Sequence, residues 1–358
     1  MSETPDYRVL HQLYTDARKK LSDETWDYIV GGAETETTLK RNRLAIDSLA
    51  LRPRVLRDVR DVQTKSVVLG QELRLPVIFA PVGSLQDITA GGAMESTLAA
   101  AEFGALHMLS SSSVPGLEEV AAAADYPKIY QLYVRGDQAW LDDRIARVIE
   151  SGYIALCLTV DLDYYGRRER DLAKAYTPTA RTRDIGEEHQ ERLSWSDIER
   201  IRSKYDIPII LKGIADPLDA KIAVEHGVVG VYVSNHGGRQ LDQGKGSLSV
   251  LPEIVAAVEG QAEIIVDGGF MRGTDILKAL ALGANAVGIG RLQCYALGAA
   301  GAVGAVRMLE LLEDEIIRAL GMLGLTSLAE LDSSFVEPAD PVGLFGTEAG
   351  FPLLREDY

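Results

Sequence analysis

Eight short apolar runs alternate with segments of helical periodicity between residues 77 and 290, and this alternation limits the folds open to the chain. Strands that alternate with helices predict a parallel sheet, and continuous apolar strands predict that both sheet faces are covered. Eight strands favour a closed (β/α)8 TIM barrel over an open doubly wound sheet, which is the alternative. The predicted strands are 77–80, 106–110, 128–133, 153–160, 208–212, 229–234, 263–267 and 286–290, and helical segments between them include 93–103, 138–151, 217–226 and 274–282.

Two segments lie outside this repeat. The first 60 residues hold helical patterns at 6–20 and 22–31, which we expect to cap the barrel bottom or to reach the active-site mouth. Residues 171–194 are polar and aperiodic, and they follow the fourth strand, where barrel enzymes carry lids. Helices at 309–323 and 327–331 are expected to close the chain. No low-complexity linker separates these parts, so we predict a single domain over 1–358.

Charge and cysteine usage narrow the class of protein. The 358 residues carry a formal net charge of -16, which disfavours nucleic acid and anionic membranes as partners. An anionic substrate would therefore need a local cationic pocket. Cys157 and Cys294 stand in apolar stretches and outside any metal-like cluster, as core thiols in a reducing compartment would. With no signal peptide evident, we expect a cytoplasmic protein that binds no metal.

Polar residues follow nearly every predicted strand. Because the C-terminal strand ends of a barrel form its active site, these side chains should converge on one face. Turn and cap roles would explain the aspartates and glycines among them, but they explain Lys212, His236 and the arginines poorly. The strand-end residues are Gln131, Tyr133, Thr159, Asp161, Lys212, Ser234, His236, Arg239, Asp267, Gly268, Gly269, Gly290 and Arg291.

The loops after the seventh and eighth strands predict a phosphate site. Glycines at 268, 269, 288 and 290 allow backbone N–H groups to approach an anion, and Arg291 offers a counter-charge. Either loop alone would be read as a plain turn. The glycines do not form the three-glycine pattern of a dinucleotide site.

His236 and Arg239 together suggest chemistry on a carboxylate-bearing substrate. The guanidinium can hold the carboxylate in a bidentate fork while the imidazole takes a proton from the next carbon or from its hydroxyl. Arg168 could supply a second cation. Asp161 could orient the imidazole, or it could equally be a helix N-cap.

The run Ser-Asn-His-Gly-Gly-Arg-Gln at 234–240 resembles the signature of the FMN-dependent α-hydroxy acid oxidising family, which includes glycolate oxidase, lactate oxidase and mandelate dehydrogenase. The resemblance covers most of the chain, with further motifs in the family's order. They lie at 26–28, 32–34, 52–54, 80–81, 109–111, 131–133, 158–161, 166–169, 211–213, 267–269 and 290–291.

The resemblance implies FMN as cofactor and a role for each matching residue. His236 would be the base, Asp161 its charge partner, and Arg168 and Arg239 the holders of the substrate carboxylate. Tyr28 and Tyr133 would bind the substrate carboxylate and hydroxyl, and Lys212 would stand beside the flavin N1 region. The implied FMN contacts are Pro81, Val82 and Gly83 at the N5 edge, Ser110, Gln131, Thr159 and Ser234 near the ring, and Asp267, Gly268, Gly269, Arg272, Gly290 and Arg291 at the ribityl phosphate.

Several positions depart from the family pattern. Met271 stands where an arginine is frequent, with Arg272 after it, which puts one phosphate contact in doubt. Ser112 replaces a frequent tryptophan, and Tyr165 replaces a smaller aliphatic residue. The wall of the substrate pocket therefore differs from that of the family. Gly83 replaces the usual alanine near N5. This position can alter how the reduced flavin meets oxygen, so both an oxidase and a dehydrogenase remain open as the type of enzyme. The lid insertion is shorter than in glycolate oxidase.

The expected function is oxidation of a small 2-hydroxy acid to a 2-oxo acid. The alternatives keep the flavin site but use it for oxidative decarboxylation or for a larger carboxylate-bearing metabolite. A catalytically silent FMN-binding barrel is a third hypothesis, and the matching of His236, Lys212 and the arginines disfavours it. The family resemblance also implies a homotetramer.

Overall fold

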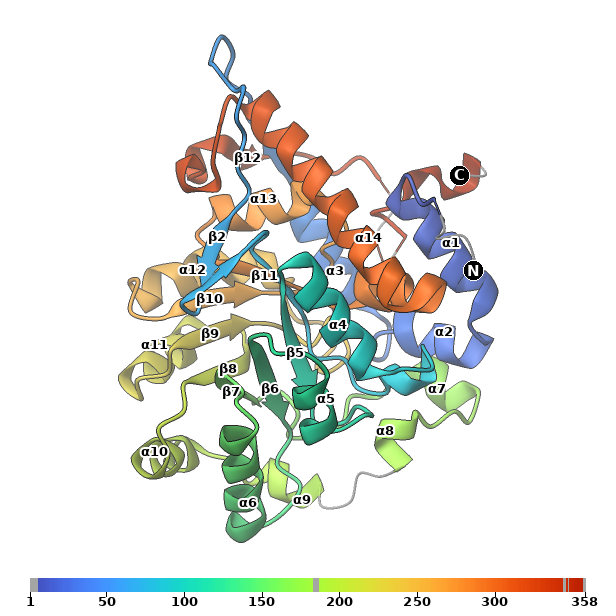
Figure 1. Ribbon diagram of the computed structural model, residues 1–358. Coiled ribbons are helices and arrows are strands. Elements are labelled where there is room, and N and C mark those ends of the chain that lie inside the picture. Colours follow the sequence, from blue (N-terminus) through green and yellow to red (C-terminus); the bar gives the residue numbers. More distant parts are fainter. Residues whose placement is uncertain (1–5, 183–186, 344–345, 347, 357–358) are drawn as a thin grey trace.

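Eight parallel strands form a closed barrel in this computed structural model, which describes residues 6–182, 187–343, 346 and 348–356 (Figure 1). The last strand pairs with the first, with Ile289 opposite Phe79, so the sheet closes and the open-sheet alternative was wrong. The predicted (β/α)8 TIM barrel is confirmed. The strands are β4 (Val77–Phe79), β5 (Leu106–Ser110), β6 (Lys128–Leu132), β7 (Ala155–Thr159), β8 (Ile209–Ile214), β9 (Gly230–Val233), β10 (Glu263–Val266) and β11 (Ala286–Ile289).

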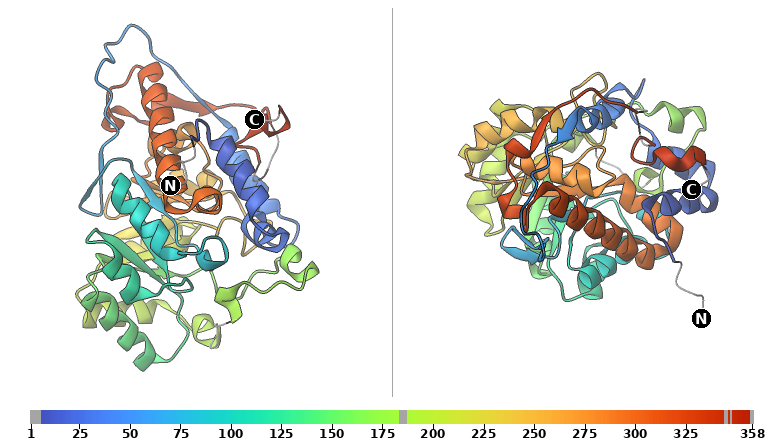
Figure 2. Two further views of the ribbon diagram at one scale, coloured as in Figure 1. Left: turned by 45° about the vertical axis from the view of Figure 1, so that its right-hand side comes forward. Right: turned by 90° about the horizontal axis from the view of Figure 1, so that it is seen from above.

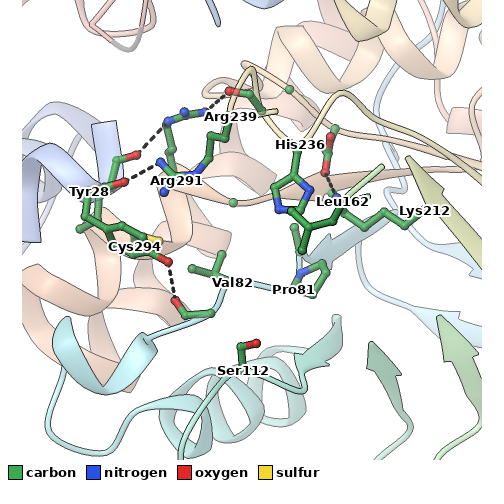
Figure 3. Close-up of a pocket in the computed structure, with 18 of the residues that line it drawn as sticks. Tyr28, Pro81, Val82, Ser112, Leu162, Lys212, His236, Arg239, Arg291 and Cys294 are labelled. Carbon is green, nitrogen blue, oxygen red and sulfur yellow. Dashed lines mark hydrogen bonds and ion pairs between the residues drawn. The ribbon is translucent and has the colours of Figure 1, made fainter. Parts of the chain in front are cut away.

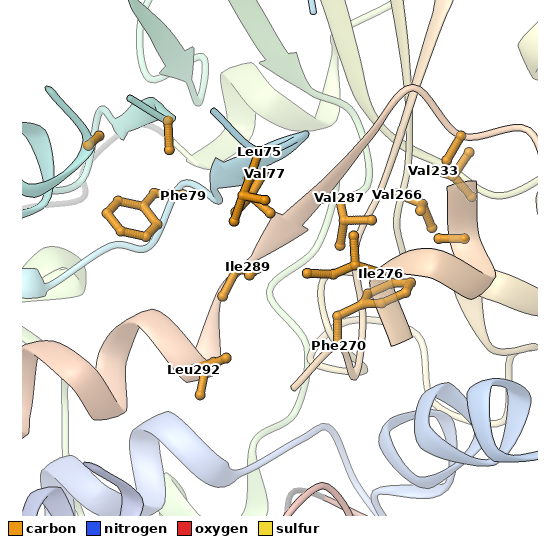
Figure 4. Close-up of a cluster of buried hydrophobic side chains, with 14 of the residues drawn as sticks. Leu75, Val77, Phe79, Val233, Val266, Phe270, Ile276, Val287, Ile289 and Leu292 are labelled. Carbon is orange, nitrogen blue, oxygen red and sulfur yellow. The ribbon is translucent and has the colours of Figure 1, made fainter. Parts of the chain in front are cut away.

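Helices surround the barrel and bury the outward faces of its strands. Figure 4 shows one such layer, in which Val287 and Val266 of the barrel pack near Ile276 of the following helix. All three side chains are fully buried, as expected for strands covered on both faces. The surrounding helices are α4 (Ala93–Phe103), α5 (Leu117–Ala123), α6 (Gln138–Glu150), α10 (Trp195–Lys204), α11 (Pro217–Glu225), α12 (Ser247–Val258), α13 (Gly273–Ala281) and α14 (Arg291–Leu323).

A hairpin closes the N-terminal end of the barrel. Strands β2 (Ser66–Val68) and β3 (Gln71–Leu73) contribute Val68 and Leu73 to the apolar cluster inside the barrel. The backbone N–H of Leu69, in the hairpin turn, donates to the Glu263 carboxylate at 2.9 Å, where β10 begins. This hairpin, not a helix of the N-terminal extension, caps the bottom.

The N-terminal helices reach the opposite end, where the strands terminate. Helix α1 (Leu10–Lys20) lies along α14, α2 (Asp23–Val30) leads to the barrel mouth, and α3 (Thr37–Asp47) packs on α12 (Figure 2). The extension therefore takes the second of its two expected positions. Short elements complete the fold: β1 (Leu49–Leu51) pairs with β12 (Val336–Pro338), and single turns form η1 (Leu85–Asp87), η2 (Leu328–Glu330), η3 (Ser333–Phe335) and η4 (Pro352–Glu356).

The insertion after β7 forms short helices across the mouth. They are α7 (Glu169–Ala173), α8 (Thr179–Thr182) and α9 (Glu187–Glu191), and residues 183–186 lie outside the described chain. The buried side chain of Gln190 ties the insertion to two strand ends. It donates to the Thr159 carbonyl at 2.8 Å and accepts from the Val134 N–H at 2.8 Å.

Helix α14 begins 18 residues earlier than the predicted 309–323 helix, directly after β11. It is kinked at Ala300 and Gly301, where Glu95 accepts a hydrogen bond from the Ala302 N–H at 2.8 Å. By length and composition alone it could cross a membrane, but 56% of its apolar window is buried inside the fold. Buried core helices meet the same criteria, so this is weak evidence for a membrane span.

Candidate active site

A cleft opens at the C-terminal ends of the strands, where the polar residues were predicted to converge (Figure 3). It holds about 1110 Å³ of space, open solvent at its mouth included, which suits a cofactor together with a small substrate. Figure 3 shows Tyr28 and Arg291 on one side and His236 and Lys212 on the other. The predicted residues that line the cleft are Tyr28, Pro81, Val82, Gly83, Tyr133, Arg168, Lys212, His236, Arg239, Asp267, Gly268, Gly269, Gly290 and Arg291.

The turn after β9 presents His236. Three consecutive residues, His236, Gly237 and Gly238, have φ angles of 59°, 65° and 75°, in the left-handed region that glycine adopts readily and histidine does not. A Cβ atom on Gly238 would lie 2.4 Å from the Leu39 backbone nitrogen, so α3 packs too closely for a side chain there. The Ser234 hydroxyl accepts from the His236 N–H at 3.0 Å and supports the strained turn.

Asp161, just beyond β7, holds the imidazole of His236. The His236 Nδ1 lies 3.0 Å from the Asp161 Oδ1, and its Nε2 lies 3.3 Å from the Tyr133 hydroxyl. Burial lowers the pKa of His236, helped by Lys212 and Arg168 and opposed by Asp161. Burial alone would raise the pKa of Asp161, but His236 and Lys212 outweigh it and keep that carboxylate ionised. The arrangement is a neutral imidazole beside an ionised carboxylate.

A backbone irregularity makes room for this pair. The register between β8 and β9 shifts between Lys212 and Ile214, and Gly213 has a φ of 113°. A Cβ atom on Gly213 would lie 2.6 Å from the Cβ of Asp161. Only a residue without a side chain fits beside the carboxylate here.

Lys212 is a buried cation in the barrel mouth. Its Nζ lies 3.1 Å from the Ser234 hydroxyl and 3.5 Å from the Asp267 carboxylate. Burial alone would lower the pKa of Lys212, but Asp267 and Asp161 outweigh it and hold the pKa above its usual value. The side chain therefore stays charged inside the protein.

Three arginines place more positive charge in the cleft. Within the described ranges, no carboxylate lies within 4.0 Å of Arg168, Arg239 or Arg291. Arg239 donates to the carbonyls of Tyr28 and Gly31 at 2.5 and 2.9 Å, and Arg291 donates to that of Gly31 at 2.7 Å. Burial and the neighbouring Arg239 lower the pKa of Arg291 to about 10. Arg168 is buried and the other two are partly buried, and guanidiniums without counter-ions form a site for anions.

The other predicted residues lie behind or away from the lining. Asp161 and Ser234 support His236 and Lys212, while Ser110, Gln131 and Thr159 are buried at the ends of β5 to β7. Arg272 was predicted to contact the cofactor phosphate, but the geometry does not bring it there. Its guanidinium pairs with Glu315 at 2.5 Å, because Arg272 caps α13 and faces α14.

Sequence reasoning missed part of the lining. Arg135, Leu162, Arg181 and Cys294 line the cleft but belong to no predicted role. Arg135 stands two residues after Tyr133, which was an available signal. Arg181 lies in the aperiodic insertion, where the pattern indicates no direction for a side chain.

A closed barrel with a base, a carboxylate partner and unpaired arginines at its C-terminal face defines an enzyme that acts on anionic molecules. Comparison with known proteins identifies its family. Residues 17–185 and 174–338 match the family described as FMN-dependent dehydrogenase. The chain belongs to this family.

Individual relatives agree with this assignment. The chain is 39% identical over 347 residues to an L-lactate oxidase of Nostoc sp., covering 89% of this chain and 95% of that protein. It is 41% identical over 340 residues to the peroxisomal (S)-2-hydroxy-acid oxidase GLO4 of Oryza sativa subsp. japonica, covering 89% and 93%. The crystal structure of mandelate oxidase with (S)-2-phenylpropionate superposes with a TM-score of 0.87 at 37% identity, covering 94% and 99%. The chain is an FMN-dependent oxidoreductase of the 2-hydroxy acid oxidising family.

The residues present fit FMN. Gln131 donates to the Thr159 hydroxyl at 2.8 Å, while its buried Oε1 has no hydrogen-bond partner among the residues described and could accept from a bound ring. A Cβ atom on Gly290 would meet nothing within 4 Å, so the backbone beside Arg291 is open to a phosphate. Met271 lines the cleft in place of the frequent arginine, so Arg291 would supply the counter-charge for the phosphate.

Proposed function

We propose that the enzyme oxidises the 2-carbon of a 2-hydroxy acid to a ketone, with His236 as base and Arg168 and Arg239 holding the carboxylate. The observation that carries this proposal is the hydrogen bond of 3.0 Å between His236 and Asp161 inside a cleft lined by both arginines. A base and a carboxylate clamp in one cleft are what proton removal beside a carboxylate requires.

Each side chain has a distinct task in this reaction. The two guanidiniums and the Tyr28 hydroxyl bind the substrate carboxylate and fix the orientation of the 2-carbon. The His236 Nε2 takes the hydroxyl proton, and the Asp161 carboxylate stabilises the imidazolium that results. The Tyr133 hydroxyl, 3.3 Å from Nε2, positions the substrate oxygen. Bound FMN supplies the acceptor for the hydrogen and electron pair that leave the 2-carbon, and the Lys212 cation favours its reduced, anionic form.

Anaerobic mixing of the purified flavoprotein with a panel of 2-hydroxy acids tests the proposal. We expect at least one member to bleach the flavin absorption and to yield the matching 2-oxo acid. Purified protein without a flavin spectrum, or bound flavin that no 2-hydroxy acid bleaches, would contradict it. The second outcome would favour the catalytically silent barrel.

The substrate wall supports an alternative reaction at the same flavin site. Ser112 and Tyr165 line the cleft and replace residues frequent in the family, so a larger metabolite or an oxidative decarboxylation fits the altered wall. Product analysis separates these reactions. Oxidation retains every carbon, whereas decarboxylation yields carbon dioxide and an acid one carbon shorter.

We further propose that the enzyme is a cytoplasmic homo-oligomer, a tetramer by family resemblance. Both cysteines are free and buried, which suits a reducing compartment. Leu56 and Met322 are exposed apolar side chains that an oligomer interface could cover, at 103% and 69% exposure. Light scattering coupled to size-exclusion chromatography measures the mass, and a monomer would rule this assembly out.

A further inference from the structure

The cleft holds more positive charge than the proposed reaction needs. Its lining includes Lys212, Arg135, Arg168, Arg181, Arg239 and Arg291, whereas Asp267 is the one carboxylate among the lining residues described. Lys212 lies beside Asp267, Arg291 beside the phosphate loop, and Arg168 with Arg239 at the substrate carboxylate. Arg135 lies over the Tyr133 ring, and Arg181, on the lid helix α8, is left without a part in these roles.

Tyr165 holds this additional cation close to the substrate clamp. The guanidinium carbon of Arg181 lies 4.0 Å from the centre of the Tyr165 ring, and that of Arg168 lies 4.1 Å from the same centre. Arg168 also donates a hydrogen bond to the Tyr165 hydroxyl. One aromatic ring thus makes cation–π contacts both with the arginine proposed to hold the substrate carboxylate and with a second arginine from the lid.

No acid within the described chain neutralises Arg181 directly. The buried carboxyl of Asp171 interacts with Arg168, Arg239 and Arg181, but burial raises its pKa and it forms no ion pair with Arg181 within 4.0 Å. Two like charges on one ring repel each other unless an anion approaches. The Arg181 side chain is exposed at the mouth, where the far end of a substrate would lie.

We propose that Arg181, carried on the Tyr165 ring, binds a second carboxylate at the distal end of the substrate. The preferred substrates are then 2-hydroxy acids whose side chain ends in a carboxylate. The small side chain of Ser112 leaves space in the cleft for such a chain. This inference rests on the proposed oxidation and names its substrate class.

A matched pair of substrates tests it. 2-Hydroxyglutarate and 2-hydroxypentanoate have the same number of carbons and differ in the terminal group. In anaerobic stopped-flow flavin reduction, we expect the dicarboxylate to show an apparent Kd about tenfold lower, the size of one charge-assisted hydrogen bond. Arg181→Gln should remove this preference and leave 2-hydroxypentanoate unchanged.

Three further variants make the result specific. Arg192→Gln removes an exposed arginine that follows α9 in the same insertion and does not line the cleft, so it should keep the preference. Tyr165→Phe retains the ring and should keep the preference, whereas Tyr165→Leu removes the ring and should reduce it. Calorimetric titration with 2-oxoglutarate and 2-oxopentanoate gives the same comparison without turnover.

The outcomes separate this inference from the proposed function. Equal losses for both substrates in Arg181→Gln would mean that the arginine only attracts anions to the cleft, and would overturn the inference. A wild-type preference for the neutral side chain, or bleaching by other 2-hydroxy acids but by neither member of the pair, would overturn it as well. If no 2-hydroxy acid bleaches the bound flavin, the proposed oxidation itself fails.

Discussion

His236 and Asp161 lie on the turns after β9 and β7, with the imidazole Nδ1 3.0 Å from the carboxylate Oδ1. The ionised carboxylate can only accept a hydrogen bond, so it fixes the tautomer in which Nδ1 carries the proton and leaves the Nε2 of the neutral imidazole free to take one. That nitrogen lies on the side of Tyr133, whose hydroxyl is 3.3 Å away. The pair therefore sets both the direction and the protonation state of the proposed base.

Replacing the base should separate flavin binding from chemistry. We expect His236→Ala to retain FMN and to slow substrate-driven bleaching by about 10²–10⁴-fold, the usual contribution of a general base. The measurement is anaerobic stopped-flow absorbance. His226→Ala, at the end of α11 outside the cleft, is the control and should bleach normally. Bleaching at the wild-type rate in His236→Ala would remove the histidine from the mechanism.

The pH dependence of flavin reduction should report the lowered pKa of His236. The base acts when neutral, so kcat/KM should fall with decreasing pH around a midpoint below 6.5, the ordinary value. Asp161 raises this pKa, so Asp161→Asn should move the midpoint to still lower pH and also reduce the plateau rate, because the imidazolium loses its partner. A midpoint that moves upward in this variant would contradict the assignment.

The shape of the Arg239 guanidinium should matter as well as its charge. Arg239→Lys retains the charge but cannot form a bidentate fork or hold the Tyr28 and Gly31 carbonyls together. We expect the apparent Kd for a 2-hydroxy acid to rise about tenfold or more, corresponding to ~1.4 kcal/mol, with FMN retained. Titration of flavin absorbance with substrate gives the value. An unchanged Kd would exclude Arg239 from the carboxylate clamp.

Met271 offers a test of the phosphate site. It is buried and lines the cleft where related sequences frequently have arginine. Met271→Arg should add a charge-assisted contact to the phosphate and slow the release of FMN on dilution, by about tenfold for one such contact. Met271→Leu, which conserves volume without charge, is the control. Equal rates of FMN release in both variants would mean that this side chain does not reach the phosphate.

Sequence reasoning predicted the barrel from its periodic pattern, and the residues at its mouth from their position after the predicted strands. Each predicted strand overlaps an observed one, and the family motif lies on the turn after β9. The roles of His236, Lys212 and the arginines remain predictions, but the structure brings their side chains into one cleft.

The remaining features depend on contacts that no local pattern encodes. The hairpin of β2 and β3 has strands of three residues each, too short for alternation to be read. The predicted helix at 309–323 omitted the helical residues that directly follow β11, because the non-helical backbone at Ala300 and Gly301 separates them from the rest of α14. Arg181 lies on α8, which is held at the mouth by a tertiary contact: the Thr179 N–H donates to the Asp87 carboxylate at 2.9 Å.

The alignment of Asp161 with His236 depends on Gly213, a residue that has no polar side chain in the site. One added methyl group there would push Asp161 away from His236 while every reactive side chain remained in the sequence. A relative with alanine at this position would display the full signature motif and still have a misaligned base. Among homologous chains, a substitution at a residue that performs no chemistry can therefore abolish activity. A search restricted to altered catalytic residues would overlook such a substitution.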